Sequence, residues 1–158
     1  MRIDGTITKI PASDSLQPQA TILSTATVSS PPNPQQAPAG PRLELHDLFN
    51  IAQWQDKIPW KRFQDGIDIH RLDGDGITGP STALMRIHKG SRVPLHVHPG
   101  REHIIVLTGS ERDQHSSIQA GTLIINSPGT QHSVVSDDGC IVLAIYESPV
   151  QFLQDPAK

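Results

Sequence analysis

The sequence contains few cysteines, few aromatic side chains and little charge of either sign. A single cysteine, Cys140, excludes an intrachain disulfide framework and a zinc site built from several thiolates, and it favours a reducing, cytoplasmic environment. The formal net charge of −3 provides no basic surface for nucleic acid. No run of 18 apolar residues occurs, and residues 1–5 do not lead into an apolar core, so we expect no membrane span and no signal peptide.

Charged and aromatic residues are also scarce near the N-terminus. Residues 11–41 hold seven of the 14 prolines, one charged residue, Asp14, and no aromatic residue. Such a segment buries too little apolar surface to offset the entropy that it loses on ordering. We therefore predict a disordered tail over residues 1–41 and a single folded domain over residues 42–158.

The predicted domain begins with an aromatic segment, residues 43–63, which contains both tryptophans. Leu48, Ile51 and Trp54 recur at helical spacing within it. This spacing predicts a short helix or turn, with Asp47 as its N-cap, that packs aromatic side chains against the main body of the domain.

From residue 66 onward, short runs rich in Ile, Val and Leu alternate with turns that contain Gly, Pro or Asp. Short, evenly spaced strands of this kind are typical of an all-β sandwich or barrel. We predict a small jelly-roll barrel with its core at about residues 66–148. The predicted strands are residues 67–72, 82–88, 92–97, 102–108, 115–119, 122–126, 132–136 and 141–147.

Histidine stands out in the composition, with eight copies. His96 and His98 are two residues apart in a predicted strand, so their side chains lie on one face. Glu102 has the same parity across the following turn and is expected to join that face, whereas His103 has the opposite parity. With His132 from a later strand, three imidazoles and one carboxylate form a donor set for one divalent transition metal: Mn, Fe, Ni, Cu or Zn.

The same residues resemble the first motif of the cupin superfamily. The fixed positions of that motif are matched, at its spacing, by Gly90, His96, His98, Glu102 and Gly109. The second motif is matched less closely. Gly121 and His132 are present, but Pro128 directly precedes Gly129, and Ser136 stands where the motif has Asn.

The resemblance implies a double-stranded β-helix, the RmlC-like jelly roll, with His96, His98, Glu102 and His132 as metal ligands. Within the superfamily the chain is most similar to the ChrR-type cupin group, over about residues 66–148. The anti-sigma activity of that group is not implied, because it requires an upstream His/Cys zinc cluster and Cys140 lies well downstream.

The expected function is that of a small-molecule oxygenase or related oxidoreductase, such as a metal-dependent dioxygenase, with Glu102 also acting as a catalytic residue. One alternative is a non-catalytic, metal-dependent sensor or binding module, and another is a sugar isomerase or epimerase. We also expect a homodimer, because residues 141–146 are apolar on both faces of their strand and both faces need covering.

A first prediction follows from the composition of the tail. A chain truncated to begin at Arg42 should melt within a few degrees of the full chain in differential scanning calorimetry, because residues 1–41 offer almost no surface for a core. A much larger fall in melting temperature would mean that this segment completes the core or an interface.

Overall fold

The computed structural model of the protein describes residues 7–10 and 42–153. Strands β1 (Ile7–Ile10) and β2 (Arg42–Leu45) pair antiparallel in a two-stranded sheet. Residues 7–10 fall within the segment expected to be disordered, and their three β-branched residues, Ile7, Thr8 and Ile10, favour extended backbone. The remainder of the predicted tail, residues 1–6 and 11–41, lies outside the described residues, where disorder stays a prediction.

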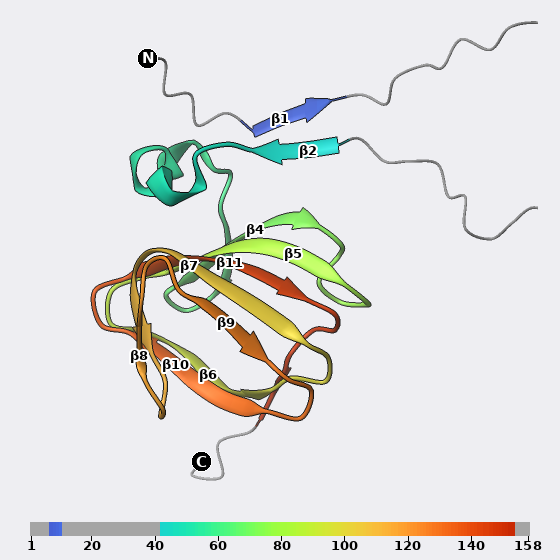
Figure 1. Ribbon diagram of the computed structural model, residues 1–158, viewed down its shortest axis with the longest axis vertical. Coiled ribbons are helices and arrows are strands. Elements are labelled where there is room, and N and C mark those ends of the chain that lie inside the picture. The colour runs from blue at the N-terminus through green and yellow to red at the C-terminus, as the bar shows by residue number, and fades with distance from the viewer. Residues whose placement is uncertain (1–6, 11–41, 154–158) are drawn as a thin grey trace, which may run out of the picture. The chain divides into compact units, whose positions relative to one another are not determined.

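The other described strands form one curled antiparallel sheet, which confirms the all-β fold (Figure 1). Their order is β12-β6-β10-β7-β11-β5-β4-β3, and β8 and β9 also pair with β7. The bounds are β3 (Lys61–Gln64), β4 (Ile67–Asp73), β5 (Ser81–Ile87), β6 (Ser91–Val97), β7 (Glu102–Arg112), β8 (Ser117–Gln119), β9 (Leu123–Asn126), β10 (Gln131–Ser136), β11 (Cys140–Tyr146) and β12 (Gln151–Phe152). Each strand predicted over residues 66–148 corresponds to one of β4 to β11, whereas β3 and β12 were not predicted.

Strand β7 joins the two layers of the curled sheet. Its first part pairs with β11 and β9, and its last part pairs with β8 and β10. The sequence predicted a break at Gly109, but the strand continues to Arg112. Gly109 has φ 74°, and a Cβ atom there would lie 2.0 Å from the carbonyl oxygen of Gly139. The glycine therefore lets the strand bend against a neighbouring turn without ending it.

The inner faces of the two layers enclose the main apolar core. Its buried side chains come from β4 to β8, β10 and β11 and include Ile67, Val106 and Val142. Cys140 belongs to this core, and its burial raises the pKa of the thiol to about 12. A thiol in this environment is protonated near neutral pH, so Cys140 is not expected to act as a nucleophile.

A second core lies on the outer side of β5, β7 and β11, beneath the aromatic segment. The predicted helix consists of two short 3₁₀ helices, η1 (Leu48–Gln53) and η2 (Gln55–Lys57). Asp47 adopts a left-handed conformation and makes no side-chain cap, which corrects the N-cap prediction. Ile51 and Trp54 are buried against Leu84, so the aromatic segment covers part of the outer face of the sheet. Leu123, Ile125 and Ile145 remain exposed on described strands.

Leu84→Ala tests this second core. Leu84 is fully buried under the aromatic segment, so its truncation should lower the free energy of unfolding by about 2–5 kcal/mol. The matched control, Leu123→Ala, should lower the free energy of unfolding by less than about 1 kcal/mol, because Leu123 is 54% exposed. Urea denaturation measures both values, and equal effects would contradict the packing of the aromatic segment against β5.

Candidate metal centre

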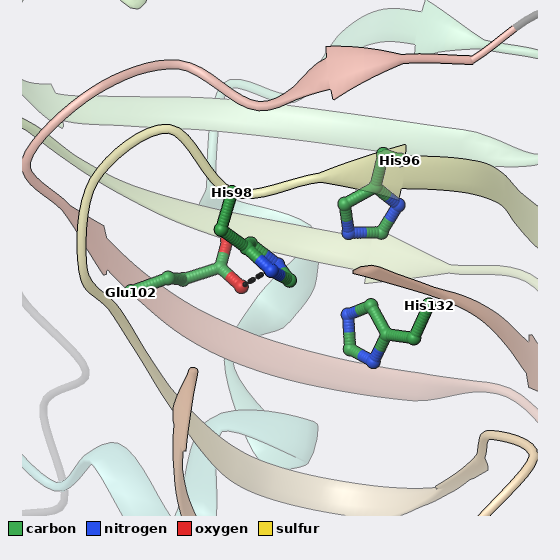
Figure 2. Close-up of side chains that lie close together, drawn as sticks. All are labelled: His96, His98, Glu102 and His132. Carbon is green, nitrogen blue, oxygen red and sulfur yellow. Dashed lines mark ion pairs between the residues drawn. The ribbon is translucent and has the colours of Figure 1, made fainter. Parts of the chain in front are cut away.

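The structure brings together the four residues predicted as metal ligands. His96 lies in β6, His98 follows that strand directly, Glu102 begins β7, and His132 lies in β10 opposite His96 in the antiparallel register. All four side chains are buried, and one potential ligand atom from each lies within 4.8 Å of the others. Figure 2 shows the three imidazole rings and the carboxylate converging on one region between the strands.

His98 is held by the turn that precedes β10. Its backbone N–H donates to the carbonyl oxygen of Thr130, and the N–H of Gly129 donates to the carbonyl oxygen of His98. The side-chain Nδ1 of His98 lies 2.9 Å from the same Thr130 carbonyl oxygen. The Pro128–Gly129 turn of the second motif thus positions a ligand from the first motif.

The Nδ1 atoms of all three rings face hydrogen-bond acceptors. Nδ1 of His96 lies 2.8 Å from the carbonyl oxygen of Pro94, and Nδ1 of His132 lies 3.5 Å from a carboxylate oxygen of Asp113. A carbonyl oxygen can only accept, so Nδ1 carries the proton in His96 and His98. In the neutral ring Nε2 then carries a free lone pair, which is the atom that a metal needs.

Glu102 is the acidic member of the group. Burial alone would raise the pKa of this carboxyl group, but His98 and the side-chain amide of Asn126 lower it below its usual value. Nδ2 of Asn126 donates to Oε2 of Glu102 over 2.9 Å. The carboxyl group is therefore ionised near neutral pH and supplies a negative charge to the site.

The imidazoles respond to the same environment in two ways. Burial lowers the pKa values of His96 and His132, so both rings are neutral near pH 7 and keep their lone pairs. Burial acts in the same direction on His98, but the carboxylate of Glu102 outweighs it and raises the pKa of this ring. The attraction that draws a proton to this position would also draw a metal cation.

One buried nitrogen, Nε2 of His98, makes an ion-pair contact but no complete hydrogen bond. Nε2 of His98 lies 3.0 Å from Oε2 of Glu102, yet it has no hydrogen-bond partner among the described residues. An unsatisfied buried nitrogen is costly unless another group completes the site. Together with the oriented lone pairs and the ionised carboxylate, this atom shows that the donor set fits a divalent transition metal.

A cavity of about 280 Å³ adjoins the four residues. His96, Glu102 and His132 line it, whereas His98 is buried and is not among the lining residues. The cavity wall is mostly apolar and includes Ile69, Met85, Val93, Ile104, Val134 and Val142. A metal held by these four residues would face this apolar space.

The ends of the curled sheet also contribute to the cavity. β3 and β12 stand at opposite ends of the strand order, and they place Phe63 and Phe152 in the cavity wall. The centroids of these two rings are 6.4 Å apart, and Phe152 also lies 5.9 Å from the ring of His96. Neither strand was predicted from the sequence, because β3 has four residues and β12 has two.

The remaining histidines of the described chain do not join the site. His103 pairs in register with Ile125 and Ile145, on the outer side of β7, in agreement with its odd parity. His88 contacts Asp68 at the surface, and His115 is exposed. Neither belongs to the group that could hold a metal.

Several residues of the site were missed in the sequence. Asn126 donates a hydrogen bond to Glu102. Its position two residues after Ile124 in a predicted strand could have indicated that the two side chains share a face. Pro94 and Thr130 act through backbone carbonyl oxygens, for which residue type gives no signal. Ser136, which replaces the Asn of the motif, is fully buried and donates to the carbonyl oxygen of Ser110.

Comparison with known proteins identifies the family. Residues 50–150, well over half of the chain, match the family described as the ChrR cupin-like domain. The chain belongs to the ChrR cupin-like domain family. The family match is longer than the similarity to ChrR-type cupins recognised over residues 66–148, and it includes most of the aromatic segment.

Individual relatives of this ChrR-type cupin agree with the assignment. Anti-sigma-E factor ChrR of Cereibacter sphaeroides is 37% identical over 118 residues, which cover 72% of this chain and 54% of that protein. The crystal structure of Rhodobacter sphaeroides SigE in complex with the anti-sigma ChrR matches at 28% identity with a TM-score of 0.52. That match covers 58% of this chain and 50% of the other. The chain thus spans about half of the ChrR length.

A third similarity concerns the fold alone. The crystal structure of an acetylacetone dioxygenase from Acinetobacter johnsonii matches with a TM-score of 0.61 at 18% identity. The match covers 78% of this chain and 85% of that chain. It shows that the ChrR-type cupin shares its jelly-roll fold with an enzyme.

His98→Ala tests the metal site. The ring of His98 is 1% exposed and contacts both Glu102 and the Thr130 turn, so its loss should remove most of the bound metal. Metal content is measured on protein purified without chelators or nickel columns. His103→Ala is the matched control and should retain the metal of the unaltered protein. Retention by His98→Ala together with loss in His103→Ala would refute the assignment.

Proposed function

We propose that this protein is a metal-dependent oxygenase, or a related oxidoreductase, that acts on a small and mostly apolar molecule. The proposal rests on one observation: three of the four candidate metal ligands line an apolar cavity. His96, Glu102 and His132 line a space of about 280 Å³ whose other walls are largely apolar. Small-molecule sites in proteins commonly combine an apolar cavity with a few convergent polar groups.

The proposed ligands are His96, His98, Glu102 and His132. When bound there, a redox-active divalent metal such as Fe or Mn supplies the electron-transfer and Lewis-acid chemistry that oxygenases use. The hydrogen bonds at Nδ1 hold His96 and His98 in the tautomer that leaves Nε2 available. The apolar wall, to which Phe63 and Phe152 contribute, offers water few hydrogen-bond partners in the reacting space.

Glu102 is proposed to act as a catalytic residue as well as a ligand. It is ionised, it faces the cavity, and one of its oxygens is fixed by the amide of Asn126. A carboxylate in this position can accept a proton from an acidic C–H or O–H group of the substrate. Asn126 is then a positioning residue, because it contacts Glu102 and is absent from the cavity wall.

Oxygen consumption tests the proposal. Protein reconstituted anaerobically with Fe(II) or Mn(II) should consume dioxygen when small apolar substrates are added, and an oxygen electrode follows the reaction. The Zn(II)-loaded protein should consume none, because Zn has no accessible redox state. His98→Ala should also be inactive, whereas His103→Ala should retain the full rate. No turnover with either redox metal across a broad substrate panel would contradict the oxygenase assignment.

A second candidate, a sensor or binding module without catalysis, is favoured by the 37% identity to ChrR. The ChrR of Rhodobacter sphaeroides crystallised in complex with the protein SigE, so a protein partner is proposed alongside a small-molecule ligand. A sensor would return its ligand chemically unchanged after incubation with the metal-loaded protein, which mass spectrometry can establish. Co-purification with the full chain but not with a chain beginning at Arg42 would place the partner contact in residues 1–41.

A sugar isomerase or epimerase is less compatible with the cavity. A sugar presents hydroxyl groups on most of its carbon atoms, and each needs a hydrogen-bond partner when buried. Side chains such as Ile69, Val93 and Val142 offer none. The wall of this cavity therefore favours an apolar molecule over a carbohydrate.

Two further expectations remain proposals. The exposed Leu123, Ile125 and Ile145 on the outer side of β9 and β11 are where a second subunit would pack in the expected homodimer. The cytoplasmic location rests on the low cysteine content. No helix in residues 42–153 or 7–10 is long and apolar enough to cross a membrane.

A further inference from the structure

Arg71 is a cationic side chain in the wall of the cavity. It follows Ile67 and Ile69 at the same parity on β4, so it continues the row of side chains that faces the interior. The cavity that it lines is the same one that His96, Glu102 and His132 line. A guanidinium group is therefore placed in the apolar space beside the proposed metal centre.

The guanidinium group is held in place from two sides. Its Nη1 donates a hydrogen bond to the hydroxyl oxygen of Tyr146, over 2.9 Å. On another side it packs against Gly76, where an added Cβ would lie 1.8 Å from Nη1 of Arg71. The backbone N–H of Gly76 is itself fixed by a hydrogen bond to Oγ of Ser81. Arg71 is thus pre-organised, which lowers the entropy that a ligand must remove on binding.

Tyr146 links Arg71 to the proposed metal centre. It lies directly opposite Glu102 in the register between β11 and β7, and both side chains line the cavity. Arg71, Tyr146 and Glu102 line one cavity, so a ligand in this cavity has access both to the metal centre and to the guanidinium group of Arg71.

Arg71 has no carboxylate partner among the described residues. Two other arginines in the described strands are paired, Arg86 with Asp68 and Arg112 with Asp137. Arg92 and Arg101 have no such partner either, but both are exposed to solvent, whereas Arg71 is half-buried in the cavity wall. A fixed and partly desolvated guanidinium without a counter-ion is a binding site for an anion.

We propose that the cavity binds a small amphipathic carboxylate, with its carboxylate group on Arg71 and its apolar body against the wall beside the metal centre. This assignment names the ligand class for the proposed small-molecule site, and it holds whether the ligand is turned over or only bound. The planar guanidinium matches the two oxygens of a carboxylate, and the remaining lining is mostly apolar.

The charge of the cavity favours a monoanion over a phosphate. Apart from a bound metal, Arg71 is the only positively charged group among the described lining residues, and Glu102 is ionised, so the second charge of a phosphate would find no cationic side chain to pair with. Burial raises the pKa of Glu111 to about 7, and the acidic neighbours Glu102 and Asp113 add to the rise. Glu111 is therefore uncharged for much of the time at neutral pH and competes weakly for Arg71.

Isothermal titration calorimetry on the full-length protein loaded with Zn(II) tests this assignment. The probes are 3-phenylpropanoate and its neutral analogue 3-phenylpropan-1-ol. The unaltered protein should bind the carboxylate about tenfold or more tightly than the alcohol, because charge-assisted hydrogen bonds are worth about this factor. Arg71→Met should abolish the preference with little effect on the alcohol, and Arg71→Lys should retain part of it.

Arg92→Met is the matched control, because it removes the same charge from an exposed strand position and should leave the preference intact. Circular dichroism and metal content establish that each variant is folded and loaded. Equal affinity for the two probes, no binding of either, or a preference that survives in Arg71→Met overturns the proposal. The last result would mean that the carboxylate binds the metal alone. Calorimetry with Zn(II) requires no turnover. A failed oxygen-consumption assay would therefore contradict the oxygenase assignment without affecting the test of carboxylate binding.

Discussion

The site depends on how three buried imidazole rings are oriented by the acceptors at their Nδ1 atoms. Two of these acceptors are backbone carbonyl oxygens, of Pro94 and Thr130, and they are fixed by the strand and turn that contain them. The third is the carboxylate of Asp113. Because the acceptors belong to the backbone framework or to a loop beside it, the direction of the lone pairs is set when the sheet forms. The orientation of the His96 and His98 rings is consequently fixed by backbone carbonyl oxygens and does not depend on flexible side chains.

The curvature of the sheet converts this donor set into a site with an enclosed space. β7 passes from one layer to the other at Gly109, which brings Glu102 at its start close to the histidines of β6 and β10. The two ends of the strand order then approach each other through Phe63 and Phe152. Residues from both ends of the strand order therefore line the cavity, although they lie far apart in the sequence.

Much of this arrangement could be predicted from the sequence, and the physical reasons are specific. Side-chain alternation along a strand relates His96 to His98 at the end of β6 and separates Glu102 from His103 at the start of β7, whereas the turn between the two strands had to keep the same parity. The same alternation along β4 could also have predicted that Arg71 faces the interior, because it has the parity of Ile67 and Ile69. The acceptors at Pro94 and Thr130 could not be predicted, since any residue offers the same carbonyl oxygen. β3 and β12 were missed because they are too short for a periodic pattern.

The histidine donors and much of the cavity wall belong to different parts of the sheet. His96, His98 and His132 come from β6, the turn after it and β10, whereas Ile69, Arg71, Met85, Val142 and Tyr146 come from β4, β5 and β11. A substitution on these latter strands can reshape the cavity without altering the histidine donors. Natural variation or directed evolution can therefore change what such a scaffold recognises while its histidine donor set is kept.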